Sequence, residues 1–162
     1  MDETRFIADS NVERLGKWLR ILGYDTVYGK EMSDDEIVRR ALAEDRVILT
    51  RDTGIVARRI VKKYVLLDSA DTMTQLRQVF TELGLKVTNS RAFTRCIVCN
   101  EAVIPISKQS AAHRVPPYVY RTQEVFAECP RCRRVYWRGT HVQNILRDLR
   151  ASLPDEDQHS CR

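Results

Sequence analysis

Residues 46–52, with the sequence RVILTRD, indicate the fold of this chain more clearly than any other stretch. Apolar residues, several of them β-branched, run as far as residue 49 and end abruptly in a threonine, an arginine and Asp52, and a helix-like run over residues 55–61 follows. A short apolar strand of this kind is typical of a parallel sheet covered by helices on both faces. Functional groups in such sheets collect at the carboxyl ends of the strands. We therefore expect Asp52 to lie at the functional edge of the sheet.

Strands and helices alternate on both sides of this stretch. The first strand also ends in an aspartate, Asp9, and Ser33 with Glu36 makes a capping box that begins a helix. Strands are expected at residues 4–8, 24–28, 46–50 and 64–67, and helices at residues 11–22, 33–42, 55–61 and 72–83. Right-handed crossovers place such helices on both faces of the sheet. The predicted fold class is α/β, a three-layer α/β/α domain with a mostly parallel sheet.

The alternation stops after residue 84, and the weak periodicity of residues 85–95 predicts a linker. We expect residues 1–88 to form the first domain and residues 94–150 to form a small cysteine module. Within that module, residues 126–137 are typical of a hairpin with a metal-binding tip, and residues 141–149 of a terminal helix. Residues 151–162 are expected to be a disordered tail.

The charge of the chain is unevenly distributed. Residues 1–90 carry 15 basic and 15 acidic side chains, whereas residues 91–162 carry 12 basic and 7 acidic ones, so the net charge of +5 belongs to the C-terminal part. A basic module beside a neutral domain with clustered carboxylates suggests a polyanionic partner. Charge that serves only solubility is the alternative.

No apolar run approaches the roughly 20 residues that a membrane helix requires. The N-terminal sequence is acidic and leads directly into a strand, unlike a secretory signal. We therefore expect a cytoplasmic protein without a membrane partner. In a reducing compartment, two Cys-x-x-Cys pairs indicate a metal site rather than disulfides.

The four paired cysteines are Cys96, Cys99, Cys129 and Cys132. Two such pairs can complete a tetrahedron around one Zn²⁺, and a site closed by four protein ligands has a structural role because no position remains for a substrate. A redox dithiol needs one pair rather than two, Cys161 stands alone in the tail, and His141 is not needed as a ligand. Nearby arginines, at residues 95, 131, 133 and 134, can offset the negative charge of the thiolates, which weakens the case for a basic RNA-binding surface.

Four aspartate positions are candidates for a second metal site. They are Asp9, Asp34 or its neighbour Asp35, Asp52 and Asp71, each at a strand end or a helix start. Carboxylates gathered there would bind one or two Mg²⁺ or Mn²⁺ ions, which can activate water against a phosphodiester. Asp34 and Asp35 can equally serve the helix dipole, and Asp71 can cap the helix that follows it. Asp34 is favoured over Asp35 because it shares the inward edge of its helix.

Other acid-using folds fit the sequence poorly. A phosphoryl-aspartate hydrolase would need Asp-x-Asp after the first strand, whereas residues 9–11 read DSN. The chain also lacks a glycine-rich phosphate loop, which excludes nucleotide hydrolysis by that mechanism.

Several motifs follow one another in the order of a known family. They are FIAD at residues 6–9, LGKWLRILGYDT at 15–26, SDDEI at 33–37 and LTRD at 49–52, and then CIVCN at 96–100, RVPPYV at 114–119 and VYWRGTH at 135–141. With these motifs the chain resembles the PIN-like ribonucleases, in particular the family named for the C-terminal domain of the Mut-seven exonuclease. The resemblance covers residues 5–141. It implies that residues 1–88 form a PIN-like nuclease domain and that a zinc ribbon follows.

The resemblance further implies metal-dependent cleavage of RNA by Asp9, Asp34 and Asp52, with Asp71 as a fourth carboxylate that matches less closely. PIN domains often have glutamate at the second position, so the run SDDEI leaves that ligand open. We expect a Mg²⁺- or Mn²⁺-dependent ribonuclease acting on single-stranded RNA. The alternative is a non-catalytic RNA- or ribosome-binding module, in which the ribbon binds RNA and the first domain is a scaffold. A toxin-like nuclease held by an antitoxin is disfavoured by the fused ribbon.

Basic side chains near the expected acidic edge are candidate RNA contacts. Arg14, Lys17 and Arg20 lie on a different stripe of the first helix from its apolar residues, and Arg51 adjoins Asp52. Such cations can pair with backbone phosphates, although ordinary surface charge explains them equally well. Aromatic residues of the ribbon alternate with arginines and suit either stacking on unpaired bases or packing of the hairpin; they are Tyr118, Tyr120, Tyr136 and Trp137.

Overall fold

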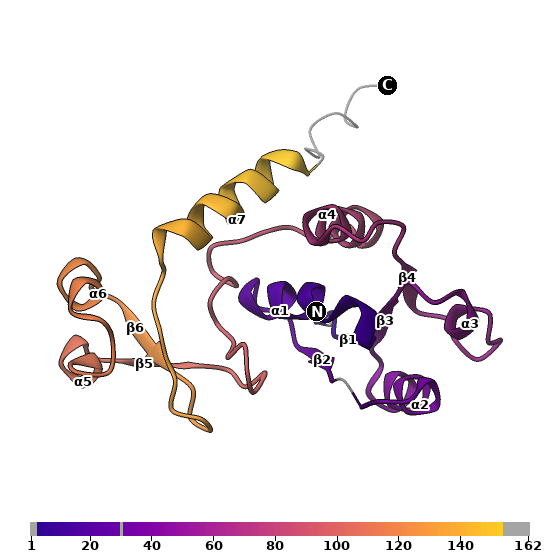
Figure 1. Ribbon diagram of the computed structural model, residues 1–162, viewed down its shortest axis with the longest axis horizontal. Helices are drawn as coiled ribbons and strands as arrows, with labels where there is room; N and C mark the ends of the chain where they lie inside the picture. Colours follow the sequence, from indigo (N-terminus) through magenta and orange to yellow (C-terminus); the bar gives the residue numbers. More distant parts are fainter. Residues whose placement is uncertain (1–2, 30, 154–162) are drawn as a thin grey trace.

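A computed structural model describes residues 3–29 and 31–153 of the chain. Its larger sheet has four parallel strands, β1 (Phe6–Ala8), β2 (Thr26–Tyr28), β3 (Val47–Thr50) and β4 (Tyr64–Leu66), in the order β2-β1-β3-β4 (Figure 1). Ile7 lies opposite Val27 on one side and Ile48 on the other. The predicted α/β fold with a mostly parallel sheet is confirmed, and each of these strand pairs is parallel.

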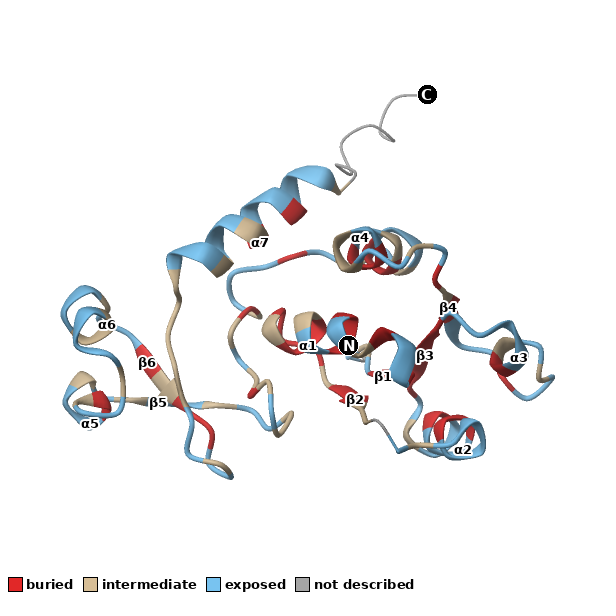
Figure 2. Cartoon of the chain, viewed as in Figure 1, coloured by how far each residue is buried: buried red, intermediate tan, exposed pale blue. Residues whose placement is uncertain are grey.

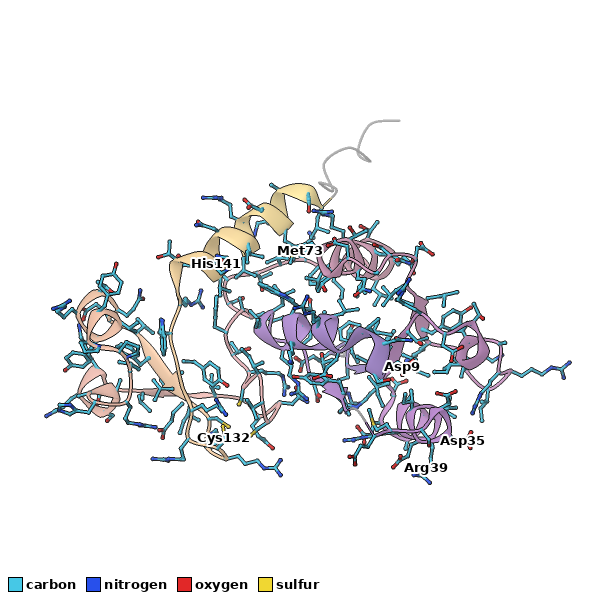
Figure 3. All side chains as sticks on the ribbon, in the orientation of Figure 1. Asp9, Asp35, Arg39, Met73, Cys132 and His141 are labelled. Carbon is cyan, nitrogen blue, oxygen red and sulfur yellow. The ribbon has the colours of Figure 1, made fainter. Side chains whose placement is uncertain are left out.

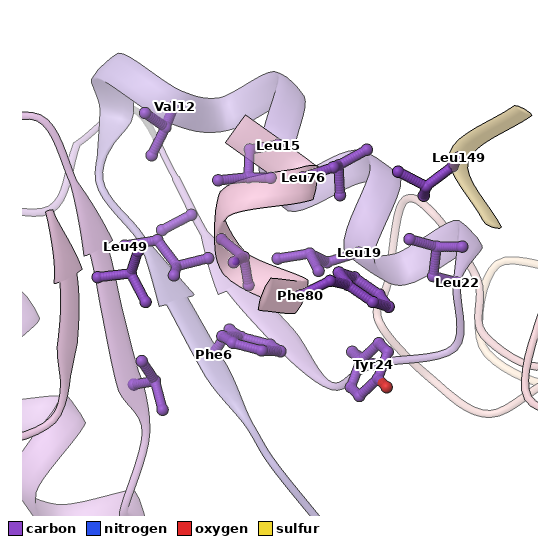
Figure 4. Packing of buried hydrophobic residues seen from close by; sticks show 14 of the residues in the cluster. Phe6, Val12, Leu15, Leu19, Leu22, Tyr24, Leu49, Leu76, Phe80 and Leu149 are labelled. Atoms are coloured by element: carbon purple, nitrogen blue, oxygen red, sulfur yellow. The ribbon is translucent and has the colours of Figure 1, made fainter. Parts of the chain in front are cut away.

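Helices cover both faces of this sheet. They are α1 (Glu13–Ile21), preceded by the 3-10 turn η1 (Ser10–Val12), then α2 (Asp34–Glu44), α3 (Thr53–Val56) and α4 (Thr72–Leu83). Because side chains alternate along a strand, Phe6 and Ala8 pack with α1 and α4 on one face, while Ile7 packs with α2 and α3 on the other. The buried residues line the inner sides of the helices in Figure 2 and pack closely in Figure 4.

Local sequence signals explain most of the helix ends. Ser33 and Glu36 form the predicted capping box at the start of α2. Gly84 ends α4 in the left-handed conformation that glycine adopts at low cost. The expected helix at residues 55–61 is wrong in length, since α3 ends at Val56. Ile55 and Val61 both pack into the same core cluster. Residues six apart point about 120° away from each other around a helix, so the chain leaves the helix to bury both.

The C-terminal part contains a second, antiparallel sheet of β5 (Ile104–Ile106), β6 (Phe126–Glu128) and β7 (Val135–Tyr136). The short helices α5 (Lys108–Ala111) and α6 (Pro117–Thr122) connect β5 to β6. Strands β6 and β7 form the expected hairpin, and residues 129–134 make its turn. We refer to residues 94–137 as the cysteine unit and to residues 3–84 as the sheet unit.

The last helix, α7 (Thr140–Ser152), returns to the sheet unit. Leu146 and Leu149 are buried in the same cluster as Leu76 and Phe80 of α4, and Figure 4 shows Leu149 beside Leu22. The predicted module of residues 94–150 includes this helix, and the predicted domain boundaries at residues 88 and 94 stay predictions. The predicted tail lies outside the described residues from position 154 onward. Within residues 3–29 and 31–153, no helix has both the length and the apolar character needed to cross a membrane.

A buried arginine joins the two units. Arg20 of α1 is 6% exposed, and its Nε donates to the carbonyl of Thr26 at 2.8 Å. Its Nη1 donates across to the carbonyls of Ile97 at 2.6 Å and Val98 at 3.2 Å, and its guanidinium carbon lies 3.9 Å from the centre of the Tyr28 ring. Positive charge is therefore aimed at main-chain oxygens between the first cysteine pair.

Two further contacts strengthen this junction at the edge strand β2. Asn100 accepts a hydrogen bond from the backbone N–H of Thr26 at 3.1 Å and donates to Asp25 at 2.7 Å. The Tyr28 hydroxyl donates to the carbonyl of Ile97 at 3.0 Å. Residues of the cysteine unit thus cover a sheet edge that would otherwise expose unpaired backbone groups.

We predict that Arg20→Ala lowers the free energy of unfolding by about 2–4 kcal/mol, because it removes three hydrogen bonds to main-chain carbonyls and opens a gap over Tyr28. Urea unfolding followed by circular dichroism measures the change. Arg39→Ala is the matched control, because Arg39 is 78% exposed and only reaches Glu36 at 3.9 Å. Equal unfolding midpoints for the two variants would contradict the assigned role of Arg20.

Candidate functional site

An aspartate follows each strand of the parallel sheet. Across the sheet they are Asp34 after β2, Asp9 after β1, Asp52 after β3 and Asp71 after β4. Because all four strands run in the same direction, these residues lie along one edge, the carboxyl edge. Asp9, Asp52 and Asp71 also cap the helical turns that they precede.

The centre of this edge is the switch point of the sheet. The chain leaves β1 toward α1 on one face and leaves β3 toward α3 on the other face, and β1 and β3 are neighbours. A crevice forms where adjacent connections diverge in this way, and ligands of open α/β sheets bind there. Asp9 and Asp52 stand on the two sides of this point.

Thr50 links these two aspartates. Its side chain is fully buried, and its hydroxyl donates to Asp9 Oδ2 at 2.8 Å while it accepts the backbone N–H of Asp52 at 2.9 Å. A hydroxyl has one hydrogen to donate, so the Asp52 amide directs that hydrogen toward Asp9. The other Asp9 oxygen accepts the backbone N–H of Ser10 at 2.7 Å. Asp9, 7% exposed, is thereby held in one orientation.

Sequence reasoning missed Thr50. A signal was present, because a polar residue ending an apolar strand between two candidate carboxylates is an unusual choice. The sequence alone places Thr50 at the end of a strand, but its contact to Asp9 spans 41 positions of the chain and is not visible in local sequence.

The outer aspartates are placed differently. Asp34 is exposed and makes no hydrogen bond or ion pair with the described residues, whereas Asp35 is 88% exposed and pairs with Arg58 at 2.6 Å. Asp71 accepts the backbone N–H of Thr74 at 2.9 Å, the capping role that was its alternative interpretation. Among residues 3–29 and 31–153, no three carboxylates bring ligand atoms within metal-binding distance of one another. Figure 3 shows Asp9 and Asp35 on different elements of this edge.

A groove of about 650 Å³ lies beside Asp71. Its lining comes from α1, the start of α4, the first cysteine pair and α7, and consists of Arg14, Lys17, Trp18, Ile21, Ala70, Asp71, Thr72, Met73, Ile97 and Ile145. Arg14 and Lys17 are exposed, and Lys17 reaches only Glu13 at 3.6 Å. The groove therefore has a cationic wall on α1 close to a carboxylate of the edge.

Not all of the predicted RNA contacts share this groove. Arg51 is exposed beside Asp52 and forms no ion pair with the described residues. The prediction that Arg20 contacts RNA is wrong. Arg20 is buried and bonded to three main-chain carbonyls, so its guanidinium is unavailable to RNA. At Arg20 the helix α1 faces the cysteine unit, and helix periodicity alone does not reveal this partner.

The four cysteines converge on one point. Their sulfur atoms all lie within 4.8 Å of one another, and those of Cys96 and Cys132 are 3.6 Å apart. A tetrahedral Zn²⁺ with bonds of about 2.3 Å sets its sulfur atoms about 3.8 Å apart, so these residues fit zinc. The backbone N–H of Cys99 points at Cys96 Sγ at 3.3 Å and that of Cys132 at Cys129 Sγ at 3.5 Å, and such bonds stabilise thiolates.

Tyr136 completes the surroundings of this centre. Its hydroxyl oxygen accepts the backbone N–H of Ile97 at 3.2 Å, which leaves its hydrogen for Cys96 Sγ at 3.0 Å. Bonds from such outer groups orient metal ligands and tune their basicity. Tyr136 is therefore occupied at the cysteine centre rather than offered to RNA bases. Tyr118, in contrast, is 68% exposed.

The protonation of the thiols also indicates a cation site. Burial alone would raise the pKa of Cys96, but hydrogen bonds from the Tyr136 hydroxyl and from backbone N–H groups lower it to about 7. Burial, hydrogen bonds with the thiols of Cys132 and Cys129, and the charge of Cys96 raise the pKa of Cys99 to about 12. The charge of one thiolate thus opposes ionisation of its neighbour, and a divalent metal ion bound here would offset this repulsion.

Residues 4–149 match the family model described as the Mut7-C RNAse domain. This span contains the four cysteines and all four aspartates of the carboxyl edge. No curated protein and no solved structure matches the chain.

We predict one zinc ion per chain, and Cys129→Ser should lose it. Without the metal the closely spaced sulfurs repel one another and the junction at Arg20 loosens, so the thermal midpoint should fall by about 10 °C or more. Metal analysis and circular dichroism measure the two effects. Cys161→Ser should keep both zinc and midpoint, because the other four cysteines suffice to close a tetrahedral site.

The same centre has a defined pH dependence. Zinc binds thiolates, so its affinity should be high at alkaline pH and fall as acid protonates the four sulfurs. Titration against a competing chelator between pH 8 and pH 5 measures this loss. A zinc affinity that does not change over that range would contradict binding by the four thiols.

Proposed function

The chain belongs to the Mut7-C RNAse domain family, and we propose that it is a metal-dependent ribonuclease that hydrolyses phosphodiester bonds of single-stranded RNA. Family membership itself carries the coarser conclusion, a ribonuclease-type function with RNA as substrate. The metal dependence, the strandedness and the site residues are our proposals. The observation that supports them most directly is the pair Asp9 and Asp52, coupled through Thr50 at the switch point of the sheet.

The carboxyl edge offers carboxylate ligands, which suit Mg²⁺ or Mn²⁺. Carboxylate oxygens are the preferred ligands of these ions, and Mg²⁺ is commonly held by one or two carboxylates together with phosphate oxygens of the substrate. We assign Asp9 and Asp52 as that pair, with Asp34 and Asp71 as flanking carboxylates. When bound, the ion supplies Lewis acidity toward water and phosphate oxygen.

The side chains of the protein have separate tasks in this proposal. Thr50 holds Asp9 in place by its hydrogen bond, so the carboxylate does not need to reorganise when substrate arrives. Arg14 and Lys17 place positive charge in the groove beside Asp71, where a phosphate backbone is attracted. Arg51, next to Asp52, can pair with a phosphate at the edge itself.

The groove supports an unpaired strand as the substrate. Trp18 lies in the same lining as Arg14 and Lys17, so an aromatic side chain and two cations are combined. Single-strand binding grooves use this combination, because bases whose faces are free stack on the aromatic ring while cations follow the backbone. Bases within a duplex have their faces covered by neighbours.

A non-catalytic RNA- or ribosome-binding module is the second candidate. One observation favours it, namely that no three carboxylates converge within the described residues. In that case the groove would bind RNA and the sheet unit would serve as its scaffold.

We predict that Asp52→Asn reduces cleavage of a labelled, unstructured RNA in Mg²⁺ or Mn²⁺ by about 10²-fold or more. Asparagine can still accept the Gly54 N–H that caps α3, so the fold should persist. Asp45→Asn is the matched control, because Asp45 is an exposed aspartate that pairs with Lys63 before β3, at the opposite edge of the sheet.

The outcomes separate the two candidates. Metal-dependent cleavage that survives in the control and disappears in Asp52→Asn supports the nuclease. Equal cleavage by wild type and Asp52→Asn would show that the assigned site is wrong. RNA binding without cleavage in wild type would favour the binding module.

We predict that Thr50→Val lowers kcat by about 10–100-fold with little change in KM, because Asp9 loses the donor that orients it. Valine has nearly the shape of threonine, so the buried site stays filled. Thr50→Ser keeps the hydroxyl and should retain most of the activity. Equal kcat values for Thr50→Val and Thr50→Ser, at equal thermal midpoints, would remove the hydroxyl from the mechanism.

A further inference from the structure

A second basic pocket lies away from the carboxyl edge, between α7 and the segment that follows α4. It has a volume of about 260 Å³ and is lined by Asn89, Phe93, Arg138, Gln143, Leu146, Arg147 and Arg150. Three of its seven lining residues are arginines and none is acidic. Figure 1 shows α7 running above this connecting segment.

Two of these arginines are held in place by neutral acceptors. Arg138 Nη2 donates to the carbonyl of Asn89 at 2.8 Å. Arg150 donates through Nε to the carbonyl of Val87 at 3.2 Å and through Nη2 to Asn89 Oδ1 at 3.0 Å. Both guanidinium groups are therefore oriented around Asn89, and each keeps an Nη1 that bonds to none of the described residues.

Acidic side chains of the described residues compensate little of the charge of this pocket. Arg138 and Arg150 form no ion pair within the described part of the chain, and Arg147 meets only the exposed Asp148, at 3.5 Å. Arginines of the cysteine unit behave differently, because Arg114 and Arg133 both pair with Glu128 at 2.9 Å. Glu128 thus neutralises part of the positive charge of the cysteine unit, whereas no acidic residue lines the pocket at α7.

The pocket and the groove share α7. Ile145 lines the groove, while Gln143 and Arg147 line the pocket, so the two openings lie on neighbouring flanks of one helix. Oriented guanidinium groups with free N–H donors match the oxygens of a phosphate, which accepts several hydrogen bonds at once.

We propose that this arginine pocket binds a backbone phosphate of the RNA strand outside the carboxyl edge, so that α7 carries a second anchoring point for the substrate. This inference rests on the proposed function, since it takes RNA as the ligand. It assigns Arg138, Arg147 and Arg150 to RNA binding rather than to the cleavage chemistry.

The test uses the full chain with Asp52→Asn as the parent, which keeps the RNA intact. Binding of a fluorescent, unstructured RNA of 16 nucleotides is measured by anisotropy over a range of salt concentrations. Into this parent we introduce Arg147→Gln, which removes a charge whose one ion pair in the described residues is with the exposed neighbour Asp148. We also introduce Arg150→Gln, with Arg150→Lys as the variant that keeps the charge. Arg39→Gln is the matched control, because Arg39 is 78% exposed and Arg147 72% exposed, and each meets one acid of its own helix. Figure 3 shows Arg39 on α2, on the opposite side of the molecule from α7.

For a single strand, each lost phosphate contact reduces the steepness of the plot of log affinity against log salt concentration by about 0.7. Relative to the affinities at 1 M salt, a variant that lacks one contact should therefore bind about fivefold more weakly than the parent at 0.1 M salt. We expect this loss for Arg147→Gln and Arg150→Gln, recovery in Arg150→Lys, and no change for Arg39→Gln. Thermal midpoints of all variants show whether the fold is kept, and Arg147→Gln decides the question if Arg150→Gln unfolds.

The result that overturns the inference is an Arg147→Gln variant that binds RNA with the affinity and salt slope of the parent. Failure of the proposed function is a different result: wild type would not cleave RNA, while the parent would still bind it in a pocket-dependent way. A parent that does not bind RNA at any salt concentration overturns both.

Discussion

The arrangement of the two units depends on the hydrogen bonds that the buried guanidinium of Arg20 donates. It donates to Thr26 in the sheet unit and to Ile97 and Val98 in the cysteine unit, so one side chain satisfies acceptors on both sides of the junction. Burial lowers the pKa of Arg20. Arginine is nevertheless suited to this place, because it stays charged in proteins and its planar fork can serve several carbonyls at once.

This junction ties the cysteine centre to the sheet unit. Residues between the first two cysteines are docked on β2, and α7, which follows the hairpin, packs against α4. The cysteine unit is therefore attached at two places, one at a sheet edge and one on a helical face. Loss of a metal from the four sulfurs would weaken the contacts of the first attachment and so destabilise the sheet unit. The thermal stability of the whole chain is therefore an informative measurement.

The carboxyl edge illustrates how a capping residue and a proposed functional residue can coincide. Asp9, Asp52 and Asp71 each satisfy backbone N–H groups at the start of a helical turn, which is sufficient reason for an aspartate there. Asp9 differs from the others because it is nearly buried and receives the Thr50 hydroxyl. A carboxylate that only capped a turn would not need a fully buried threonine to orient it, so this extra bond is the reason to place function at β1 and β3.

The sequence by itself determined the parallel α/β sheet, the capping box at Ser33, the end of α4 at Gly84 and the pairing of four cysteines, because each depends on residue type and on spacing within a short segment. Only the tertiary structure decided the role of Arg20, the link from Thr50 to Asp9, the bond of Tyr136 to Cys96 and the return of α7 to the sheet unit. Each of these joins residues 40 or more positions apart. Local periodicity shows which side of a helix is polar, but the partner that covers that side comes from another part of the chain.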